Sequence, residues 1–511
     1  MKIVKLLKAL KQLHLLSPLG LVRLTRAFSK HGINMMMLLS FAGKSYGNKI
    51  ALVDDREKLS YEELWTDCEQ LSLLLHEKFN LKKGRKVAFF CKNHASMVKA
   101  IFAVSGVGAD IYLLNSEMST QQFNQLASQH DFDLLIYDIE FSPKIDQSVY
   151  KGLKLLANHD SLPAINNVDM LNFNVDSLVQ RTSFSKIMLL TGGTSGASKT
   201  VTHQPSLFNY LSPFMALVDR LKLLQHSTAY IATPIYHGYG IAILFSLIAL
   251  GKKVVLTQNF NAVTAGTLID EHQVEVITVV PLMLQRLLDE DPKKLASLQC
   301  VAAGGAPINA RLVSRTLKEL GDVLFNLYGT SETGLNTIAA PADLRNSPHT
   351  IGKKIKGMDL DVLNEANSPA EIGEVGRFCI KNEWSMKNKK TSWIETGDIG
   401  YVDIQGRYFL SGRVDDMIIS GGINVYPLDI ERELLEHPHI EDAAVVGIFD
   451  EQFGQRLKAF IRPQGVGELS SDNVLQWLKP RVARFQMPKE IVIMERLPYT
   501  PLGKLDKKQL K

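Results

Sequence analysis

The sequence predicts an α/β protein with a large N-terminal domain and a smaller C-terminal domain. The chain has 511 residues, too many for a single ordinary hydrophobic core. Apolar strand-like segments alternate with helical patterns from residue 50 to about residue 340, as in parallel sheets covered by helices. After residue 350 the segments become short and rich in turns, which indicates a small barrel-like unit, and an α+β pattern follows. The content of hydrophobic residues, 45%, and of charged residues, 22%, is ordinary for a globular protein.

The elements of the large domain follow from local patterns. The segment "SYEELWTDCEQLSLLLHEKF" predicts a helix that begins after Ser60, with Glu63 completing a capping box. The segments "KVAFFCKN", "STAYIATP", "KKVVLT", "VEVITVVP" and "LQCVAAGGAP" predict buried strands. The apolar run "YGIAILFSLIAL" is too short to cross a membrane and predicts a buried helix. We therefore expect two parallel α/β layered subdomains and a small β-barrel in residues 49–414, and an α+β domain in residues 415–511.

Residues 1–48 form a predicted basic amphipathic arm. No acidic residue precedes Asp54, whereas the first 53 residues carry nine lysines and arginines. Leucines and one isoleucine recur at helical spacing between these cations, so residues 1–30 could lie on an anionic membrane surface. The alternative is a helix packed on the protein's own core. No nucleic-acid partner is expected, because no aromatic residues alternate with the lysines.

The cysteine pattern indicates a reducing compartment. The four cysteines are scattered and form no CxxC pair, which argues against a disulfide framework and against a zinc site. We therefore expect a cytoplasmic protein. The basic arm also allows peripheral contact with the inner face of the membrane.

One loop has the composition of a phosphate-binding loop. The stretch "LLTGGTSGASKTVTHQ" offers backbone N–H groups at its glycines, several hydroxyl groups and the charge of Lys199 after a strand-like segment. It contains no GxxxxGK[ST] pattern. Taken alone, such a loop is more often a plain surface turn.

Further motifs favour the phosphate-binding interpretation. The segment "NLYGTSETG" places Tyr328 where it could stack on a base and Glu332 where it could hold a hard cation. Asp398 and Arg413 suit ribose hydroxyls and an α-phosphate, and Lys504 follows a Pro–Gly turn near the C-terminus. Each residue alone has a purely structural explanation, but their order and spacing form a specific pattern.

From about Ala51 to Lys511 the sequence resembles the acyl-adenylate-forming superfamily of acyl-CoA synthetases, adenylation domains and luciferases. The motifs that carry the resemblance are "TGGTSGASKT", "TPIYHGYG", "AAGGAP", "YGTSE", "TGD", "GRVDDMIISGG" and "TPLGKLDK". The first departs from the family pattern at Gly192, Ser198 and Thr200, which affects the expected handling of pyrophosphate.

The resemblance implies roles for the matching positions. The implied catalytic residues are Lys504, Glu332, Thr191 and His237, with Glu332 also the implied metal ligand. The implied cofactor-binding residues are Gly193, Thr194, Ser195, Gly196, Lys199, Gly304, Gly305, Ala306, Pro307, Asn326, Tyr328, Gly329, Thr330, Ser331, Asp398, Arg413, Asp415, Gly421 and Gly422. The C-terminal domain would be a mobile lid that carries Lys504 and pivots at Asp415.

The implied function is an AMP-forming acyl-CoA synthetase that uses ATP, Mg²⁺ and coenzyme A. A medium- to long-chain fatty acid is the first expectation for the substrate, because the basic arm suits a lipid. A CoA ligase for an aromatic or other small carboxylic acid is the alternative. An ATP-binding regulatory protein without ligase activity is an alternative from another class, suggested by the altered phosphate loop.

Overall fold

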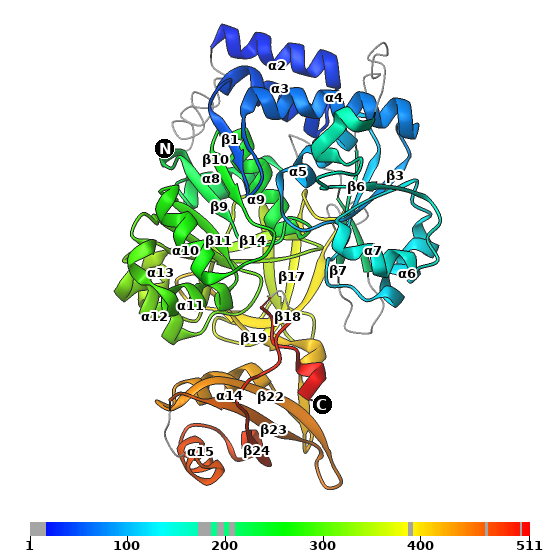
Figure 1. Ribbon diagram of the computed structural model, residues 1–511. Helices are drawn as coiled ribbons and strands as arrows, with labels where there is room; N and C mark the ends of the chain where they lie inside the picture. The colour runs from blue at the N-terminus through cyan, green and yellow to red at the C-terminus, as the bar shows by residue number, and fades with distance from the viewer. Residues whose placement is uncertain are drawn as a thin grey trace.

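A computed structural model describes residues 17–171, 185–191, 199–203, 210–386, 392–465, 469–500 and 503–510 (Figure 1). The tip of the glycine-rich loop, residues 192–198, and the first 16 residues of the basic arm lie outside these ranges. The figure shows a large layered domain and a small domain below it, joined near β19. This is the two-domain α/β class that the sequence predicts.

The first sheet of the large domain is almost wholly parallel. In the described ranges its strands lie in the order β6-β5-β3-β4-β7-β8, and only the edge pair β7–β8 is antiparallel. The strands are β3 (Lys86–Phe90), β4 (Asp110–Leu113), β5 (Leu134–Tyr137), β6 (Leu153–Leu156), β7 (Ile187–Thr191) and β8 (Lys199–His203).

The second sheet has a parallel half and an antiparallel half. Its described strands lie in the order β16-β17-β18-β19-β15-β14-β13-β12-β11-β9-β10-β1-β2. The parallel half contains β1 (Ile50–Val53), β9 (Thr228–Ile231), β10 (Lys253–Leu256), β11 (Val276–Val279), β12 (Cys300–Gly304) and β13 (Leu324–Thr330), and β2 (Lys58–Ser60) pairs antiparallel with β1 at its edge. The antiparallel half contains β14 (Gly334–Ala339), β15 (Thr350–Lys354), β16 (Met358–Leu363), β17 (Gly376–Asn382), β18 (Ile394–Val402) and β19 (Tyr408–Arg413). The short strands expected after residue 350 therefore belong to the same sheet as the parallel strands, because β14 pairs with β13.

Helices fill the space between the sheets and cover their outer faces (Figure 1). The main core joins Phe89 of the first sheet and Val276 of the second through Ile101 and Leu244, which lie on helices between them. The helices are α2 (Pro18–His31), α3 (Met35–Tyr46), α4 (Tyr61–Phe79), α5 (Ala95–Gly106), α6 (Thr120–His130), α7 (Ser142–Asp146), α8 (Leu211–Arg220), α9 (Gly238–Ala249), α10 (Ala262–Glu271), α11 (Pro281–Glu290), α12 (Ala310–Glu319) and α13 (Pro341–Asn346). The predicted capping box is present at α4, where Ser60 and Glu63 bond each other's backbone N–H groups.

The described part of the N-terminal arm consists of two helices with different environments. Helix α3 is embedded in the main core through residues such as Met36 and Leu39. Helix α2 packs Ala27 against Met37 and Phe41 of α3 and leaves its other face exposed. Among the helices in the described ranges, none combines the length and apolarity needed to cross a membrane.

The C-terminal domain is a small α+β unit. Its sheet has the order β21-β20-β23-β22, with β24 paired to β23. The elements are β20 (Ile418–Ser420), β21 (Ile423–Val425), β22 (Ile440–Asp450), β23 (Gly454–Pro463), β24 (Glu490–Ile493), α14 (Pro427–Leu435) and α15 (Ser471–Leu478). The short 3-10 turn Val414–Asp416 links this unit to β19.

The close approach of β15 to β14 in the antiparallel half of the second sheet identifies a position that requires glycine. Gly352 of β15 has φ +86°, and a Cβ atom there would lie 2.1 Å from the Ala339 backbone nitrogen of β14. We expect Gly352→Ala to lower the free energy of unfolding by about 2 kcal/mol or more, through backbone strain and collision with the neighbouring strand. Denaturant unfolding with Gly373→Ala as the matched control measures this. Gly373 has φ +85° and open space around its Cβ position, so the control isolates the strain, expected at about 1 kcal/mol. Equal losses of unfolding free energy in the two variants would show that the close approach of β15 to β14 does not contribute to the need for glycine.

Candidate active site

The candidate site lies where parallel strands of the second sheet end. The carboxyl ends of neighbouring parallel strands open on the same edge of a sheet, which is where α/β proteins bind ligands. Strand β12 ends at Gly304 and pairs in parallel with β13, which carries Tyr328. Gly304 allows close packing here, since a Cβ atom would lie 3.0 Å from the Leu327 carbonyl oxygen.

Three predicted site residues from distant parts of the chain are in direct contact. The Tyr328 hydroxyl donates a hydrogen bond to Asp398 Oδ2 at 2.7 Å, and Arg413 donates to Asp398 Oδ1 at 3.1 Å. Asp398 and Arg413 lie opposite each other on β18 and β19. Gly397 makes room for this pair: its φ is +78°, and a Cβ atom there would lie 2.9 Å from an Arg413 guanidinium nitrogen.

Burial sets the electrostatics of this cluster. Asp398 is buried, and this raises the pKa of its carboxyl group, while the Tyr328 hydrogen bond and the Arg413 charge act in the opposite direction. Burial also raises the pKa of the Tyr328 hydroxyl, and the neighbouring Asp398 raises it further. The hydroxyl is therefore a hydrogen-bond donor over the whole physiological range, and the carboxylate keeps Oδ1 and Oδ2 oriented by two fixed partners.

Lys504 reaches the cluster from the C-terminal domain. Its turn is closed by Thr500, whose N–H donates to the Lys504 carbonyl oxygen at 2.7 Å. The turn packs on the large domain, since the Cβ position of Gly503 lies 2.7 Å from Val280 at the end of β11. The Lys504 side chain keeps contact with solvent, but surrounding protein atoms and the Arg413 charge lower the pKa of its ammonium group.

His237 lies at the beginning of α9 and faces the same region. Burial and the Lys504 charge lower the pKa of its imidazole to about 4, so the ring is neutral at physiological pH. Among the described residues, its buried Nε2 atom has no hydrogen-bond partner. The neighbouring Gly238 lies against Leu189 of β7, which brings this helix start next to the strand that leads into the glycine-rich loop.

The Glu332 loop is held rigidly while its carboxylate stays available. The Thr333 carbonyl oxygen accepts from Asn382 at 3.0 Å, the Glu332 carbonyl oxygen accepts from Met386 N–H at 2.8 Å, and Thr330 bonds Thr333 through their hydroxyl groups. The Glu332 carboxylate makes no hydrogen bond or ion pair with any residue in the described ranges, and its charge acts on Asp398. A free carboxylate on a fixed loop is the kind of donor that Mg²⁺ requires.

Other predicted site residues have varied positions. The backbones of Thr191 and Lys199 pair where β7 meets β8, whereas Gly193, Thr194, Ser195 and Gly196 lie outside the described residues. Gly305, Ala306 and Pro307 follow β12, and the first and last of them are exposed. Gly329 and Thr330 end β13, next to Ser331. Asn326 is buried and donates to the Thr350 carbonyl oxygen at 3.1 Å, so it fastens β15 to β13.

The remaining predicted residues belong to the C-terminal side of the molecule. Asp415 lies 3.7 Å from Arg413, between β19 and the C-terminal sheet. Gly421 and Gly422 form the exposed turn between β20 and β21, where the Gly421 N–H donates to the Phe453 carbonyl oxygen.

Sequence reasoning missed two residues that support the site. The Tyr239 hydroxyl donates to the Ala302 carbonyl oxygen of β12 at 2.7 Å, and the Thr396 hydroxyl accepts the Asp398 N–H at 3.1 Å. Both lie two positions from a predicted site residue, His237 and Asp398, and this proximity was the only available signal.

One further group of possible metal ligands, Cys91, His94 and Asp138, occurs within the described ranges. His94 Nδ1 accepts the Met97 N–H at 3.0 Å, and its Nε2 bonds Asp138 at 2.8 Å. The second Asp138 oxygen accepts the Lys92 N–H at 2.8 Å. Both ring nitrogens of His94 are thus used in hydrogen bonds, and this buried network caps α5.

The fold joins a large layered domain to a small domain whose Lys504 lies near Arg413 and Asp398 of the large domain. Comparison with known families makes the class specific. Residues 40–388 match the family "AMP-binding enzyme", and residues 429–504 match "AMP-binding enzyme C-terminal domain". The chain therefore belongs to the AMP-binding enzymes, and its predicted membership in the acyl-adenylate-forming superfamily and its predicted fold class are confirmed. AMP-forming ligation of an acid is the reaction class of this family.

Individual relatives and solved structures extend this result. The chain is 28% identical to the 2-succinylbenzoate–CoA ligases of Bacillus pumilus (strain SAFR-032) and Bacillus subtilis (strain 168), over 91% of this chain and 95% of each relative. The fold is similar to that of o-succinylbenzoate CoA synthetase from Bacillus subtilis in complex with its acyl-adenylate intermediate OSB-AMP, with a TM-score of 0.81 and 24% identity over 93% of this chain and 97% of that one. It is also similar to ATP-bound MatB from Rhodopseudomonas palustris, with a TM-score of 0.83 and 22% identity over 94% and 98% of the two chains.

The environment of Lys504 predicts a pH dependence. Surrounding protein atoms and Arg413 lower the pKa of Lys504 below its ordinary value of 10.5, and the proposed role of this residue would need a protonated ammonium to neutralise phosphate charge. The pH dependence of kcat/KM for ATP reports ionisations of the free enzyme. We expect this quantity to decline with rising pH at a lower pH than the one at which an unperturbed lysine loses its proton. Acid-dependent pyrophosphate release measured across pH tests this. Lys504→Arg keeps its charge, so its alkaline decline should move to higher pH, whereas an unchanged profile would assign the decline to another group.

Proposed function

We propose that the protein is an AMP-forming CoA ligase that activates an aromatic carboxylic acid of the 2-succinylbenzoate type. The supporting observation for the chemistry is the convergence of Lys504, Asp398, Arg413 and His237 at the strand ends. The support for the substrate is the name shared by the relatives that cover 91% of the chain. These relatives favour the predicted aromatic alternative over the fatty acid that was the first expectation.

In the first half-reaction, a carboxylate oxygen of the acid attacks the α-phosphorus of ATP. An oxygen–phosphorus bond forms, the bond to the β-phosphate oxygen breaks, and acyl-AMP and pyrophosphate result. Lys504 and Arg413 lie where their charges would neutralise the negative charge of the reacting phosphate. Asp398, held by Tyr328, would accept hydrogen bonds from the ribose hydroxyl groups, and Glu332 would hold the Mg²⁺ that balances the phosphate charge. Thr191, Lys199 and the glycine-rich loop between them would bind the outer phosphates.

In the second half-reaction, the thiol sulfur of CoA attacks the acyl carbon. A thioester bond forms, the acyl–oxygen bond to AMP breaks, and the thiol proton is lost. Lys504 would leave the site as the C-terminal domain turns at Asp415, and the glycines of the turn Gly421–Gly422 would let pantetheine pass close to the backbone. The set of ATP, Mg²⁺ and CoA agrees with the solved relatives, one of which is described as a complex with ATP and magnesium ion.

His237 is the candidate for contact with the acid itself. Its neutral ring and its unpartnered Nε2, judged against the described part of the chain, leave one hydrogen bond to be made inside the site. A buried polar atom without a partner is costly, so a polar group of the substrate would compensate for it. A succinylbenzoate has a second carboxylate and a ketone that could do so, whereas the tail of a fatty acid could not.

The test is a panel of free acids assayed for pyrophosphate without CoA, and for AMP and thioester with CoA. We expect 2-succinylbenzoate to give the largest kcat/KM, with octanoate and palmitate at least tenfold lower. His237→Ala should lower kcat/KM for 2-succinylbenzoate more than it lowers kcat/KM for benzoate, because only the bifunctional acid has a second polar group. A preference for palmitate would restore the fatty acid. ATP binding without pyrophosphate release from any acid would favour the regulatory alternative.

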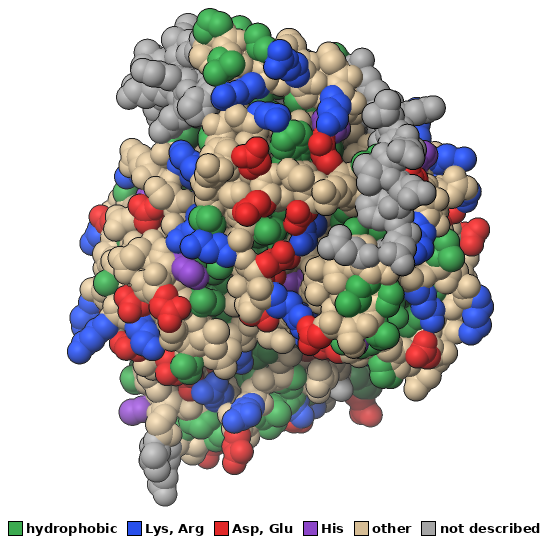
Figure 2. Space-filling model, turned by 45° about the horizontal axis from the view of Figure 1, so that its top comes forward, with side chains coloured by type: hydrophobic (Ala, Val, Ile, Leu, Met, Phe, Trp, Pro, Cys, Tyr) green, Lys and Arg blue, Asp and Glu red, His purple; other side chains and the backbone are tan. Residues whose placement is uncertain are grey.

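We also propose that helix α2 makes a peripheral contact with anionic membranes. Its outer face exposes Leu19, Leu21, Val22 and Phe28 by 40% to 58% of their surface. Figure 2 shows hydrophobic and basic side chains next to each other at the top of the molecule, where this helix lies. An apolar face bordered by cations is typical of helices that lie in the headgroup region.

A double variant tests the membrane contact. Leu21→Ser combined with Phe28→Ser removes two exposed apolar side chains, so we expect binding to phosphatidylglycerol vesicles to fall about tenfold or more, with little change in stability. Vesicle co-sedimentation measures this, and Ile404→Ser, which changes an exposed side chain elsewhere, is the control. Equal sedimentation of the double variant and the control would remove the proposed contact.

A further inference from the structure

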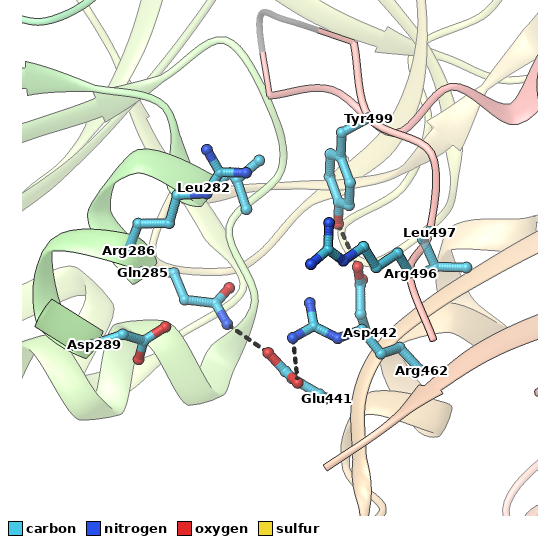
Figure 3. Close-up of a pocket in the computed structure, with 10 residues that line it drawn as sticks. All are labelled: Leu282, Gln285, Arg286, Asp289, Glu441, Asp442, Arg462, Arg496, Leu497 and Tyr499. Atoms are coloured by element: carbon cyan, nitrogen blue, oxygen red, sulfur yellow. Dashed lines mark hydrogen bonds and ion pairs between the residues drawn. The ribbon is translucent and has the colours of Figure 1, made fainter. Parts of the chain in front are cut away.

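A cavity of about 500 Å³ lies between the two domains, beside the segment that leads to Lys504 (Figure 3). One wall is helix α11, with Gln285 and Arg286. The other wall belongs to the C-terminal domain, with Arg462 on β23 and Arg496 and Tyr499 after β24. This volume is within the usual range of ligand sites, roughly 300–1,000 Å³.

The acidic side chains that line the cavity already have partners. Asp442 accepts from the Tyr499 hydroxyl at 2.7 Å, and Glu441 pairs with Arg462 at 2.8 Å and accepts from Gln285 at 3.4 Å. The third acidic residue, Asp289, pairs with Arg315 of helix α12. The negative charge that faces the cavity is therefore largely compensated within the protein.

Two arginines that line the cavity differ from these acidic side chains in their lack of partners. Arg286 of the large domain and Arg496 of the small domain make no hydrogen bond or ion pair with the residues that the structure describes. Figure 3 shows their guanidinium groups directed into the space from opposite walls. Both residues are exposed to solvent, and two guanidinium groups on opposite walls of one cavity can donate to the oxygens of one multiply charged anion.

We propose that this interdomain cavity binds a phosphate-type anion between Arg286 and Arg496, and that the bound anion stabilises the domain orientation that places Lys504 beside Asp398 and Arg413. Phosphate oxygens match the planar fork of arginine donors, and a dianion satisfies both groups. The anion could be inorganic, such as pyrophosphate, or a phosphate ester such as the phosphorylated ribose of a nucleotide.

The coupling to Lys504 follows from the wall of the cavity. Tyr499, fixed by Asp442, pairs with Leu505 at the base of the turn that carries Lys504. An anion that joins α11 to Arg496 therefore fixes this base against the large domain. The consequence for catalysis rests on the function proposed above: the anion would favour acyl-AMP formation and retard the thioester step, which requires Lys504 to leave.

Binding is tested by calorimetric titration of the protein after its active site is saturated with Mg²⁺ and α,β-methylene-ATP. We expect one remaining site for pyrophosphate or for adenosine 3′,5′-bisphosphate, weakened at least tenfold by Arg286→Gln and by Arg496→Gln. Arg56→Gln, which changes an exposed arginine on the β1–β2 turn, should bind as the unaltered protein does. Tighter binding of pyrophosphate would indicate an inorganic anion, and tighter binding of adenosine 3′,5′-bisphosphate would indicate a phosphate ester. Absence of binding by both probes, or equal binding in all variants, would overturn the proposal.

A kinetic measurement separates this site from the proposed function. Inorganic phosphate should slow thioester formation from preformed acyl-AMP at least twofold in the unaltered protein and in Arg56→Gln, but not in the Arg286→Gln/Arg496→Gln double variant. Equal slowing in all three proteins would assign the effect to the active site and overturn the regulatory role. Failure of the ATP analogue to bind would contradict the proposed function and leave the titration with phosphate probes interpretable.

Discussion

The buried carboxylate of Asp398 is the interaction on which the rest of the candidate site depends. A carboxylate at this depth is destabilised unless fixed donors compensate for the lost water. Tyr328 and Arg413 are those donors, at 2.7 Å and 3.1 Å, and they belong to strands β13 and β19. The same contacts therefore join the parallel half of the second sheet to its antiparallel half and orient the oxygens that would face a ribose. Loss of either donor would alter both the sheet junction and the site.

Under the proposed function, a repulsion between two cations of the site would help the small domain to leave. Lys504 and Arg413 are both cations, and the Arg413 charge lowers the pKa of the Lys504 ammonium group. The described contacts between the domains include polar ones, such as Gln285 with Glu441 at 3.4 Å and Arg311 with the Ile440 carbonyl oxygen at 2.5 Å. Polar interfaces of this kind permit relative domain motion. Substrate phosphates would hold the closed orientation, and their departure would release it.

Local patterns predicted much of the fold, whereas the contacts within the site depend on long-range pairing. The capping box at Ser60 and the apolar strands follow from spacing over a few residues. Tyr328 and Asp398 are 70 positions apart, and their contact arises because β13, β14, β15, β19 and β18 lie side by side. No local signal distinguishes Asn326, which fastens β15, from Tyr328, which faces the site two residues later. Family resemblance grouped these residues, but it could not say which of them are structural.

The expectation of a fatty acid came from the basic arm, and the fold explains why this was weak support. Helix α2 packs on α3 at the end of the large domain opposite the C-terminal domain (Figure 1). The candidate site lies at the other end, beside β18 and β19. Motifs around Asp398 and Lys504 would handle the phosphates of any acyl-adenylate and carry no information on the acyl group. Under the proposed function, discrimination between acids would come from the region of His237. The ring there is neutral and its Nε2 has no partner among the described residues, so it would favour a substrate with a second polar group.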